Sequence, residues 1–343
     1  MKKLENTLYI MSPETRVSKD GDNLVVQKDA EEIGRFPVHL LESVISFTYS
    51  GISTQAMILC SENSVPIFFM SPNGRFISSV TGPIEGNVLL RRAQFRAADN
   101  EEMCLKISKN MIRGKITNSM KLIDGHIMEH HDEEDDWDVL SDIREELNAS
   151  LSSLNAAEEL DVIRGIEGDA ARTYFRAVDN MIVKNRKDFF LRGRSKRPPA
   201  DRMNALLSFS YSILANETRS ALMAVGLDPF VGFLHADRPG KPSLALDMME
   251  ELRSPIADRF VLDIVNSGLI GPNDFNEDGE EGIVLDRHAR KLFIREWQSR
   301  KRIEIPHRVL GEKIAMGLIP YVQSQILARF LTGETDDYSP YTA

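Results

Sequence analysis

The spacing of apolar and polar residues changes character near residue 84. Residues 1–83 alternate short apolar runs, such as NLVVQ at positions 23–27, with turn sequences, such as KDGD at positions 19–22. Short apolar runs bounded by Gly, Asp, Asn and Pro are typical of β-strands. We therefore expect a small β-rich N-terminal domain, closed by one helix over residues 53–60 with Ser53 or Thr54 as its N-cap.

Helical periodicity dominates beyond that point. Residues 84–100 are interpreted as a linker and the start of the helical region, and residues 101–333 as an α-helical domain with few strand signals. Residues 272–282 are rich in Asn, Asp, Glu and Gly and predict a mobile loop, and residues 334–343 predict a flexible tail. The expected fold class is α+β: a small β-rich domain followed by a larger all-α domain.

Length and composition agree with this division. A chain of 343 residues, 42% hydrophobic and 27% charged, has the composition of an ordinary globular protein and room for about two domains. Cys60 and Cys104 share no metal-binding spacing and predict buried thiols in a reducing compartment. No apolar run approaches the ~20 residues of a membrane span, and the first residues, MKKLENTLYIM, lack a signal-peptide core. We therefore expect a cytoplasmic location.

The formal net charge of −10 is concentrated in one stretch. Residues 124–146 hold eleven Asp and Glu against one Arg, so the rest of the chain is neutral as a whole. Two basic stretches stand out from that neutral background: residues 182–203, with eight Lys and Arg against two Asp, and residues 286–302, with seven against two acidic residues. Both are compatible with a polyanion such as nucleic acid, and as readily with two solvated helix faces.

The acidic stretch also contains three histidines that could bind a metal together with the neighbouring carboxylates: His126, His130 and His131. Little around them is apolar enough to order such a site. We therefore favour a solvated loop or helix edge for this stretch.

The most informative stretch is residues 231–263, which predicts a loop followed by a helix. His235 lies in the loop, and Ser243 is expected to cap the helix that carries Asp247 and Glu250. The two carboxylates are three residues apart and point from one helix face, where burial is costly unless something neutralises them. A divalent cation would do so, with His235 as a further ligand. On spacing alone we favour the alternative, an exposed acidic stripe beside a hydrogen-bonded loop histidine.

Two other positions attract attention because their residue types are unusual for a plain helix. Glu167 stands between Gly165 and Gly168, and each glycine costs a helix about 0.5–1 kcal/mol. Close approach of a ligand or of another backbone would explain the glycines, and a glutamate favoured by the helix dipole is the alternative. Asn204 and Tyr211 are seven residues apart and share a helix face, where we favour buried polar partners over a ligand site.

Three separated stretches coincide with the motifs of one family. They are residues 165–175 (GIEGDAARTYF), residues 197–211 (RPPADRMNALLSFSY) and residues 232–253 (GFLHADRPGKPSLALDMMEELR). In their order, their spacing and the β-then-helical layout, the chain resembles the CRISPR-associated integrase, the first ("Cas one") protein of the adaptation machinery. The likeness covers nearly the whole chain. Residues 290–298 and 338–341 resemble the subtype I-C branch of that family.

The resemblance implies a metal-dependent DNA integrase and endonuclease of antiviral defence, with its catalytic domain at residues 101–333. The family's metal site, which takes Mg²⁺ or Mn²⁺, carries over to Glu167, His235 and Glu250. Asp247 matches a further acidic position, and its role as a direct or outer ligand is open. Six residues are implied to contact the DNA: Arg192, Arg194, Lys196, Arg197, Lys241 and Ser243.

The resemblance also implies partners. The family's N-terminal domain forms a homodimer, and two such dimers sandwich a dimer of a small ferredoxin-like partner ("Cas two") in a heterohexamer. The implied substrates are double-stranded DNA, namely a spacer precursor and the CRISPR repeat, joined by transesterification from a DNA 3′-hydroxyl. Two alternatives stay open: a metal-dependent nuclease of branched DNA without an integration role, and a non-catalytic DNA-binding scaffold.

Overall fold

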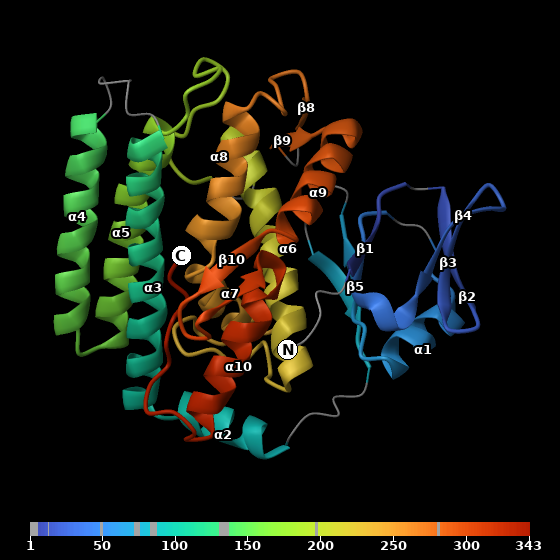
Figure 1. Cartoon of the computed structure of the whole chain (residues 1–343), viewed down its shortest axis with the longest axis horizontal. Helices are drawn as coiled ribbons and strands as arrows, with labels where there is room; N and C mark the ends of the chain where they lie inside the picture. The colour runs from blue at the N-terminus through green and yellow to red at the C-terminus, as the bar shows by residue number, and fades with distance from the viewer. Residues whose placement is uncertain are drawn as a thin grey trace. The chain divides into compact units, whose positions relative to one another are not determined.

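In the computed structural model the chain divides into two compact units, Met1–Asn87 and Val88–Ala343 (Figure 1). The structure describes residues 6–12, 14–48, 51–71, 76–82, 88–129, 137–195, 198–279 and 282–343. The N-terminal unit is β-rich and the C-terminal unit is mostly helical, which confirms the expected order of the two fold types. Among the described residues no helix is long and apolar enough to cross a membrane.

The described residues of the N-terminal unit form two sheets, one α-helix and a short 3₁₀-helix, Val38–Leu40. One sheet is the antiparallel meander β2-β3-β4, and the other has the order β1-β5-β6-β7, in which only β7 runs antiparallel to its neighbour. Helix α1 (Thr54–Glu62) begins as predicted, because Ser53 Oγ accepts a hydrogen bond from Ala56 N at 3.2 Å. The strands are β1 (Asn6–Ile10), β2 (Thr15–Asp20), β3 (Asn23–Lys28), β4 (Glu31–Pro37), β5 (Leu41–Ser46), β6 (Ile67–Met70) and β7 (Phe76–Val80).

The C-terminal unit consists of long helices arranged around a buried one. Helices α3, α4 and α5 pack against one another, and α6 lies in the centre of the unit with most of its surface covered (Figure 1). The α-helices are α2 (Val88–Ala98), α3 (Glu101–Glu129), α4 (Trp137–Ala156), α5 (Leu160–Asn180), α6 (Arg202–Val225), α7 (Ser243–Glu250), α8 (Arg259–Asn266), α9 (Arg287–Lys301) and α10 (Ile319–Leu331). A π-helical segment, Arg253–Asp258, connects the end of α7 to α8.

The C-terminal unit also contains two β-hairpins, so the expectation of an all-α domain is corrected to a mostly helical one. Strand β8 (Phe275–Asp278) pairs with β9 (Gly282–Leu285) where a mobile loop was expected, and β10 (Glu304–His307) pairs with β11 (Glu312–Ala315). Ile283 N donates to Pro199 O at 3.1 Å and anchors the first hairpin. Strands of four residues are too short to give a periodic signal, which explains why the sequence did not predict them.

The last residues of the chain are packed, in contrast to the flexible tail expected at residues 334–343. Tyr338 and Tyr341 are only 1% and 3% exposed. Tyr338 Oη donates to Glu251 Oε1 at 2.7 Å, and Asn118 Nδ2 donates to Tyr341 O at 2.9 Å. A tyrosine buries a large apolar ring and brings a hydroxyl that needs a partner, so two of them are enough to order this segment.

Candidate active site

Asp247 organises the loop that carries His235. The Asp247 side chain is fully buried on α7 and accepts hydrogen bonds from the backbone N–H groups of Phe233 (2.7 Å), Leu234 (3.0 Å) and His235 (3.0 Å). Its Oδ1 also lies 2.6 Å from His235 Nδ1. A carboxylate holds a neutral histidine in the tautomer with the proton on Nδ1, which leaves the lone pair on Nε2. The His235 ring is therefore oriented, with one nitrogen available.

The beginning of α7 approaches this loop very closely. A Cβ atom on Gly232 would lie 2.7 Å from Asp247 Oδ2 and 2.8 Å from Ser243 Cβ, so only glycine fits there. The prediction that Ser243 caps α7 is wrong: Pro242 occupies the cap position, and Ser243 Oγ instead donates to Ala236 O at 3.2 Å. Ser243 is fully buried, so the structure does not support a phosphate contact by its hydroxyl.

Arg164 ties the same loop to α5. Its Nε and Nη2 both donate to Leu234 O, at 2.9 and 2.7 Å, directly before His235. Arg164 precedes Glu167 by three residues, so the two side chains leave nearly the same face of α5. One turn of α5 therefore both holds the histidine loop and presents the glutamate. Sequence reasoning missed Arg164, because a lone arginine near the start of a helix resembles a solvated one.

The glutamates of α5 and α7 face one cation from α3. Lys115 Nζ forms an ion pair with Glu167 Oε1 and lies 2.8 Å from Glu250 Oε2. On the other side, Arg253 Nη2 lies 2.8 Å from Glu250 Oε1. The Glu250 side chain is only 3% exposed, whereas that of Glu167 is 27% exposed. The exposed acidic stripe that spacing favoured is wrong, because Asp247 and Glu250 are both buried, and the positive partners of Glu250 are protein side chains.

Sequence reasoning also missed Lys115, although a signal was present. Lys115 belongs to the helical series of buried α3 positions that includes Ile107, Met111, Asn118 and Leu122. A lysine within such a stripe must find a negative partner or remain unpaired in the interior. Its two partners are 52 and 135 positions away in the sequence, so no local pattern could name them.

Two neighbouring glutamates at the end of α7 have opposite electrostatics. Burial acts to raise the pKa of Glu250, but the charges of Arg253 and Lys115 outweigh burial and lower that pKa to about 2. Burial raises the pKa of Glu251 to about 8, and the hydrogen bonds from the neutral side chains of Tyr338 and Gln323 offset this only in part. Glu250 is therefore ionised at neutral pH and Glu251 is protonated.

The chemistry of the donors fits a divalent cation, although the ligands are not gathered around one point. Within the described ranges, no three His, Cys, Asp or Glu side chains are already close enough to hold a metal. The ammonium of Lys115 instead stands between Glu167 and Glu250. Glu250 Oε2 is buried and lacks a hydrogen bond of normal geometry, despite its 2.8 Å ion-pair distance from Lys115. Two carboxylates and an imidazole suit Mg²⁺ or Mn²⁺ once that ammonium leaves.

A buried polar cluster supports Arg253 from behind. The guanidinium of Arg253 stacks on the Tyr211 ring at 4.9 Å from its centroid. Asp258 accepts hydrogen bonds from Tyr211 Oη at 2.6 Å and Tyr174 Oη at 2.9 Å. Asn204 is fully buried and its Nδ2 donates to Gly193 O at 2.8 Å. The preference for buried polar partners at Asn204 and Tyr211 is therefore confirmed.

The residues implied to contact DNA have different surroundings. Arg194 is half-buried, pairs with Asn204 Oδ1 and stacks on Tyr211, so it belongs to the polar cluster rather than to an open surface. Arg192 is exposed and Lys241 is half-exposed. Lys196 and Arg197 lie outside the described residues, as do His130 and His131.

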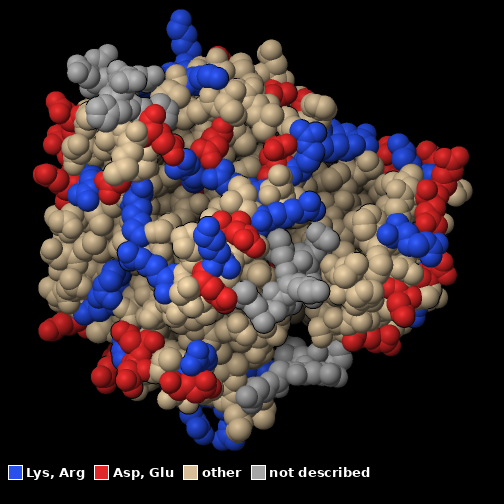
Figure 2. Space-filling view, in the orientation of Figure 1, with Lys and Arg blue, Asp and Glu red and all other residues tan. Residues whose placement is uncertain are grey.

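One face of the surface carries charges of both signs. On the face drawn in Figure 2, Lys and Arg side chains lie among Asp and Glu side chains. Several cations of the basic stretch at residues 286–302 have internal partners: Lys301 Nζ is buried 2.8 Å from Glu217 Oε1, and Arg300 pairs with Asp263. Each basic stretch therefore includes side chains that pair with other groups of the protein and are not free to bind a polyanion.

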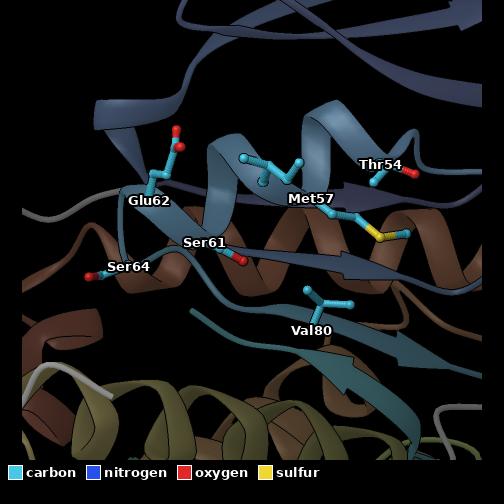
Figure 3. A pocket seen from close by; sticks show the side chains of 7 residues that line it. Thr54, Met57, Ser61, Glu62, Ser64 and Val80 are labelled. Carbon is cyan, nitrogen blue, oxygen red and sulfur yellow. The ribbon is translucent and has the colours of Figure 1, made fainter. Parts of the chain in front are cut away.

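The N-terminal unit contains a hollow that shares no residue with this site. Its volume is about 390 Å³, and it opens beside α1 and β7 (Figure 3). Its lining is mixed and carries one carboxylate: Thr54, Met57, Ile58, Ser61, Glu62, Ser64 and Val80. It contains no histidine and no second acidic group, so we do not assign the chemistry to it.

Solved structures define the class of fold. The chain superimposes on a casposase bound to its integration product with a TM-score of 0.82 at 23% identity, covering 98% of this chain and 93% of that one. It superimposes on a CAS1 protein from Thermotoga maritima with a TM-score of 0.81 at 20% identity, covering 98% and 99%. The β-rich unit followed by a helical unit is therefore a fold that both of these proteins share.

The sequence comparisons define the family. Residues 8–299 match the family described as CRISPR associated protein Cas1. A CRISPR-associated endonuclease Cas1 of Chlorobaculum tepidum is 40% identical over 341 residues, with 99% of both chains covered. One of Rhodospirillum rubrum is 41% identical over 350 residues, again with 99% of both covered. The chain belongs to the Cas1 family of CRISPR-associated proteins, whose curated relatives are named endonucleases.

Proposed function

We propose that this chain is a metal-dependent DNA integrase of CRISPR adaptation with DNA endonuclease activity. One observation carries the proposal: glutamates from α5 and α7 both face the Lys115 ammonium, and His235, which Asp247 orients, is near enough for its charge to lower the pKa of Glu250. Glu167, His235 and Glu250 would hold Mg²⁺ or Mn²⁺ in this arrangement. Membership in a family whose curated relatives are named endonucleases supports an activity on phosphodiester bonds.

The residues of the site have different roles in the proposed reaction. When bound, the cation would supply Lewis-acid polarisation of the phosphodiester. Asp247 keeps His235 Nδ1 engaged, so Nε2 is the nitrogen left to bind. The Asp247 carboxylate also accepts hydrogen bonds from the backbone N–H groups of Phe233 and Leu234, which hold the whole loop in one conformation. The imidazole of His235 therefore does not have to be ordered when DNA binds.

The proposed reaction balances without a covalent intermediate on the protein. The 3′-oxygen of the incoming DNA strand forms a bond to phosphorus as the bond from phosphorus to the 3′-oxygen of the target strand breaks. The released 3′-oxygen takes up a proton, and the attacking hydroxyl loses one. Arg253, which is held by Glu250 and Tyr211, would add positive charge beside Glu250 that favours an anionic phosphate there. Hydrolysis differs only in that water replaces the 3′-hydroxyl.

The proposed partners are double-stranded DNA, a second copy of the chain and the small Cas2 protein. A chain in a solved Cas6-RT-Cas1–Cas2 complex has the same fold, with a TM-score of 0.84 at 21% identity, and this chain spans 36% of it. We propose a homodimer through the N-terminal unit and a heterohexamer with Cas2. The free thiols of Cys60 and Cys104 are both buried, which supports a reducing location such as the cytoplasm.

An integration assay tests the proposal. The purified chain is mixed with its small partner, a short duplex with 3′-hydroxyl ends, a supercoiled plasmid carrying the repeat, and Mn²⁺. We expect joined DNA, and we expect it to disappear in Glu250→Ala, in the nearly isosteric Glu250→Gln, and in wild type with EDTA. Glu159→Gln removes a charge near the start of α5, outside the site, and should retain activity.

The alternatives give different results in the same assay. Cleavage without joining would support a nuclease with no integration role, which the names of the curated relatives also allow. DNA binding without any reaction under either metal would leave the non-catalytic scaffold. Unchanged joining by Glu250→Gln would show that the assigned site is wrong even if the activity is correct.

A further inference from the structure

Four charged side chains form an electrically balanced group around Glu250. Lys115 Nζ contacts both Glu167 and Glu250, and Arg253 contacts Glu250 from the other side. The side chains of Lys115, Glu250 and Arg253 are 8%, 3% and 16% exposed. Two negative and two positive charges therefore cancel in surroundings that screen poorly. A divalent cation that enters between the glutamates must meet a positive charge at short range.

Lys115 is the cation that can leave. Arg253 stacks on Tyr211 and contacts Glu250 from the first residue of the π-helical segment, so its position is fixed from two directions. Within the described part of the chain, the Lys115 ammonium contacts only Glu167 and Glu250. A lysine carries its charge on a flexible four-carbon stem, whereas an arginine fork loses its geometry when it moves. Glu167 is the most exposed of the four, so the ammonium has an exit on that side.

We infer that Lys115 is a positioning residue that holds Glu167 and Glu250 together in the metal-free chain and is displaced from between them when a divalent cation binds. The inference rests on the proposed metal site and adds that breaking the Lys115 ion pairs lowers the affinity of that site for the cation. The chain binds the cation more weakly than its carboxylates and imidazole alone would, because an internal ion pair must break first. Before metal binds, the Lys115 ammonium offsets the repulsion between the Glu167 and Glu250 carboxylates.

A Mn²⁺ titration of the full chain, followed by the electron paramagnetic resonance signal of free Mn²⁺, tests the inference. Lys115→Met removes the ammonium and keeps most of the side chain, and Lys115→Arg keeps the charge. Lys109→Met is the matched control, because it removes a lysine from the same helix whose Nζ donates to Asn155 O. We expect Lys115→Met to bind Mn²⁺ at least about tenfold more tightly than wild type, and the other two variants to stay within about threefold.

A purely structural role for Lys115 would give the opposite result, since damage to the site lowers metal affinity. Equal or weaker Mn²⁺ binding by Lys115→Met, in protein whose circular dichroism matches wild type, overturns the inference. Equal tightening in Lys109→Met also overturns it, because the effect would then be one of net charge alone.

A second measurement uses the wild-type chain and does not depend on whether Lys115→Met folds. Reductive methylation labels accessible amines, and Lys115 is only 6% exposed as a residue. We expect Mg²⁺ to raise the methylation of Lys115, read by mass spectrometry of its peptide, and to leave that of Lys109 unchanged. Unchanged labelling of Lys115 at a Mg²⁺ concentration that fills the site overturns the inference.

The two levels of failure are distinguishable. If neither wild type nor Lys115→Met binds Mn²⁺ or Mg²⁺ at millimolar concentrations, the proposed metal site is wrong, and the inference is overturned with it. If both bind with the same affinity, the metal site stands and only the displacement of Lys115 is overturned.

Discussion

Asp247 and Glu250 lie on one face of α7 but have different surroundings. Asp247 accepts three backbone N–H groups and contacts His235 Nδ1, so its two oxygens are fully engaged in shaping a loop. Glu250 forms ion pairs with Lys115 and Arg253. A bound cation could replace the lysine as a partner of Glu250, and a bound phosphate could replace Glu250 as a partner of either side chain. The spacing of the two carboxylates indicated that they share a helix face. Only their partners in the folded structure show that Asp247 orients His235 and that Glu250 is the carboxylate able to bind a cation.

Asp247→Asn should therefore damage the site through His235. An amide offers one oxygen where the carboxylate offers two, and its NH₂ group would meet the N–H groups that Asp247 now accepts. We expect the integration rate to fall by about 10–100-fold, as for other residues that orient a ligand, together with a lower melting temperature. Asp237→Asn is the control, because exposed Asp237 makes one long contact to Gly232 N at 3.4 Å. Equal losses in the two variants would contradict this role.

Glu251 predicts a pH dependence of stability. Burial raises its pKa from 4.5 to about 8, so the folded chain keeps a proton that the unfolded chain releases. The stability that this proton gives is fully present below the unfolded value and is lost as the pH rises toward about 8. Glu251→Gln mimics the protonated form at every pH. We expect its melting temperature, relative to wild type, to be higher at about pH 9 than at about pH 5. A difference that does not change with pH would show that Glu251 is ionised in the folded chain.

At the scale of elements, the end of the chain fastens α3 to α7. A Cβ on Gly114 of α3 would lie 2.8 Å from Pro340 Cβ and 3.1 Å from Glu251 Cβ, so the three segments meet where a side chain would not fit. Asn118, also on α3, donates hydrogen bonds to Glu251 O and to Tyr341 O. Lys115 and Glu250 are the next residues along these two helices, so the packed C-terminal segment fixes the distance between them.

Tyr338→Phe should loosen this junction. The variant removes the hydroxyl that donates to Glu251 and accepts from Gln323, while Gln323 Nε2 still donates to Glu251 Oε1. We expect the free energy of unfolding to fall by about 0.5–1.5 kcal/mol, measured by urea denaturation. Tyr341→Phe is the matched control, because burial alone raises the pKa of the Tyr341 hydroxyl and no hydrogen-bond partner contributes among the described residues; this variant should stay within about 0.5 kcal/mol of wild type. The reverse order of the two losses would contradict this assignment.

Local signals in the sequence predicted local structure well at this scale. The Ser53 cap and the long helical region follow from residue preferences and periodicity, which depend on near neighbours. The Ser243 cap failed because the hydroxyl found Ala236 O instead, a contact that depends on how the loop folds back. The packed tail was missed because a short segment of mostly polar residues, ETDDYSPYTA, has the composition of a disordered end. Only the docking of its tyrosines orders it.

At the scale of the whole molecule, the candidate site lies entirely in the C-terminal unit. Its groups come from α3, α5, α7 and the loop before α7, all within Val88–Ala343. The N-terminal unit has its own core of buried residues from both of its sheets. The positions of Glu167, His235 and Glu250 came from a resemblance spread over the chain. No property of composition or charge alone would have chosen them.

This division predicts that metal binding survives loss of the N-terminal unit. We expect residues 88–343, produced alone, to fold and to bind Mn²⁺ within about threefold of the full chain, because every charged group assigned to the site belongs to these residues. We also expect integration to be lost, since the N-terminal unit is proposed to make the dimer. Mn²⁺ titration and the integration assay on the same preparation check both parts. Normal integration by the fragment would contradict the proposed dimer, and a fragment that does not bind Mn²⁺ would contradict the independence of the site.

The ion pairs of Lys115 and Arg253 with Glu250 also affect how experiments on this chain are read. A structural zinc site collapses when its metal is removed, because the ligands have no other partner. Here each glutamate already has a protein cation beside it. Dialysis against a chelator should therefore leave a folded protein that can be reloaded with a different ion. Activity lost on chelation and regained on reloading would then report on the chemistry of the ion and not on refolding of the chain.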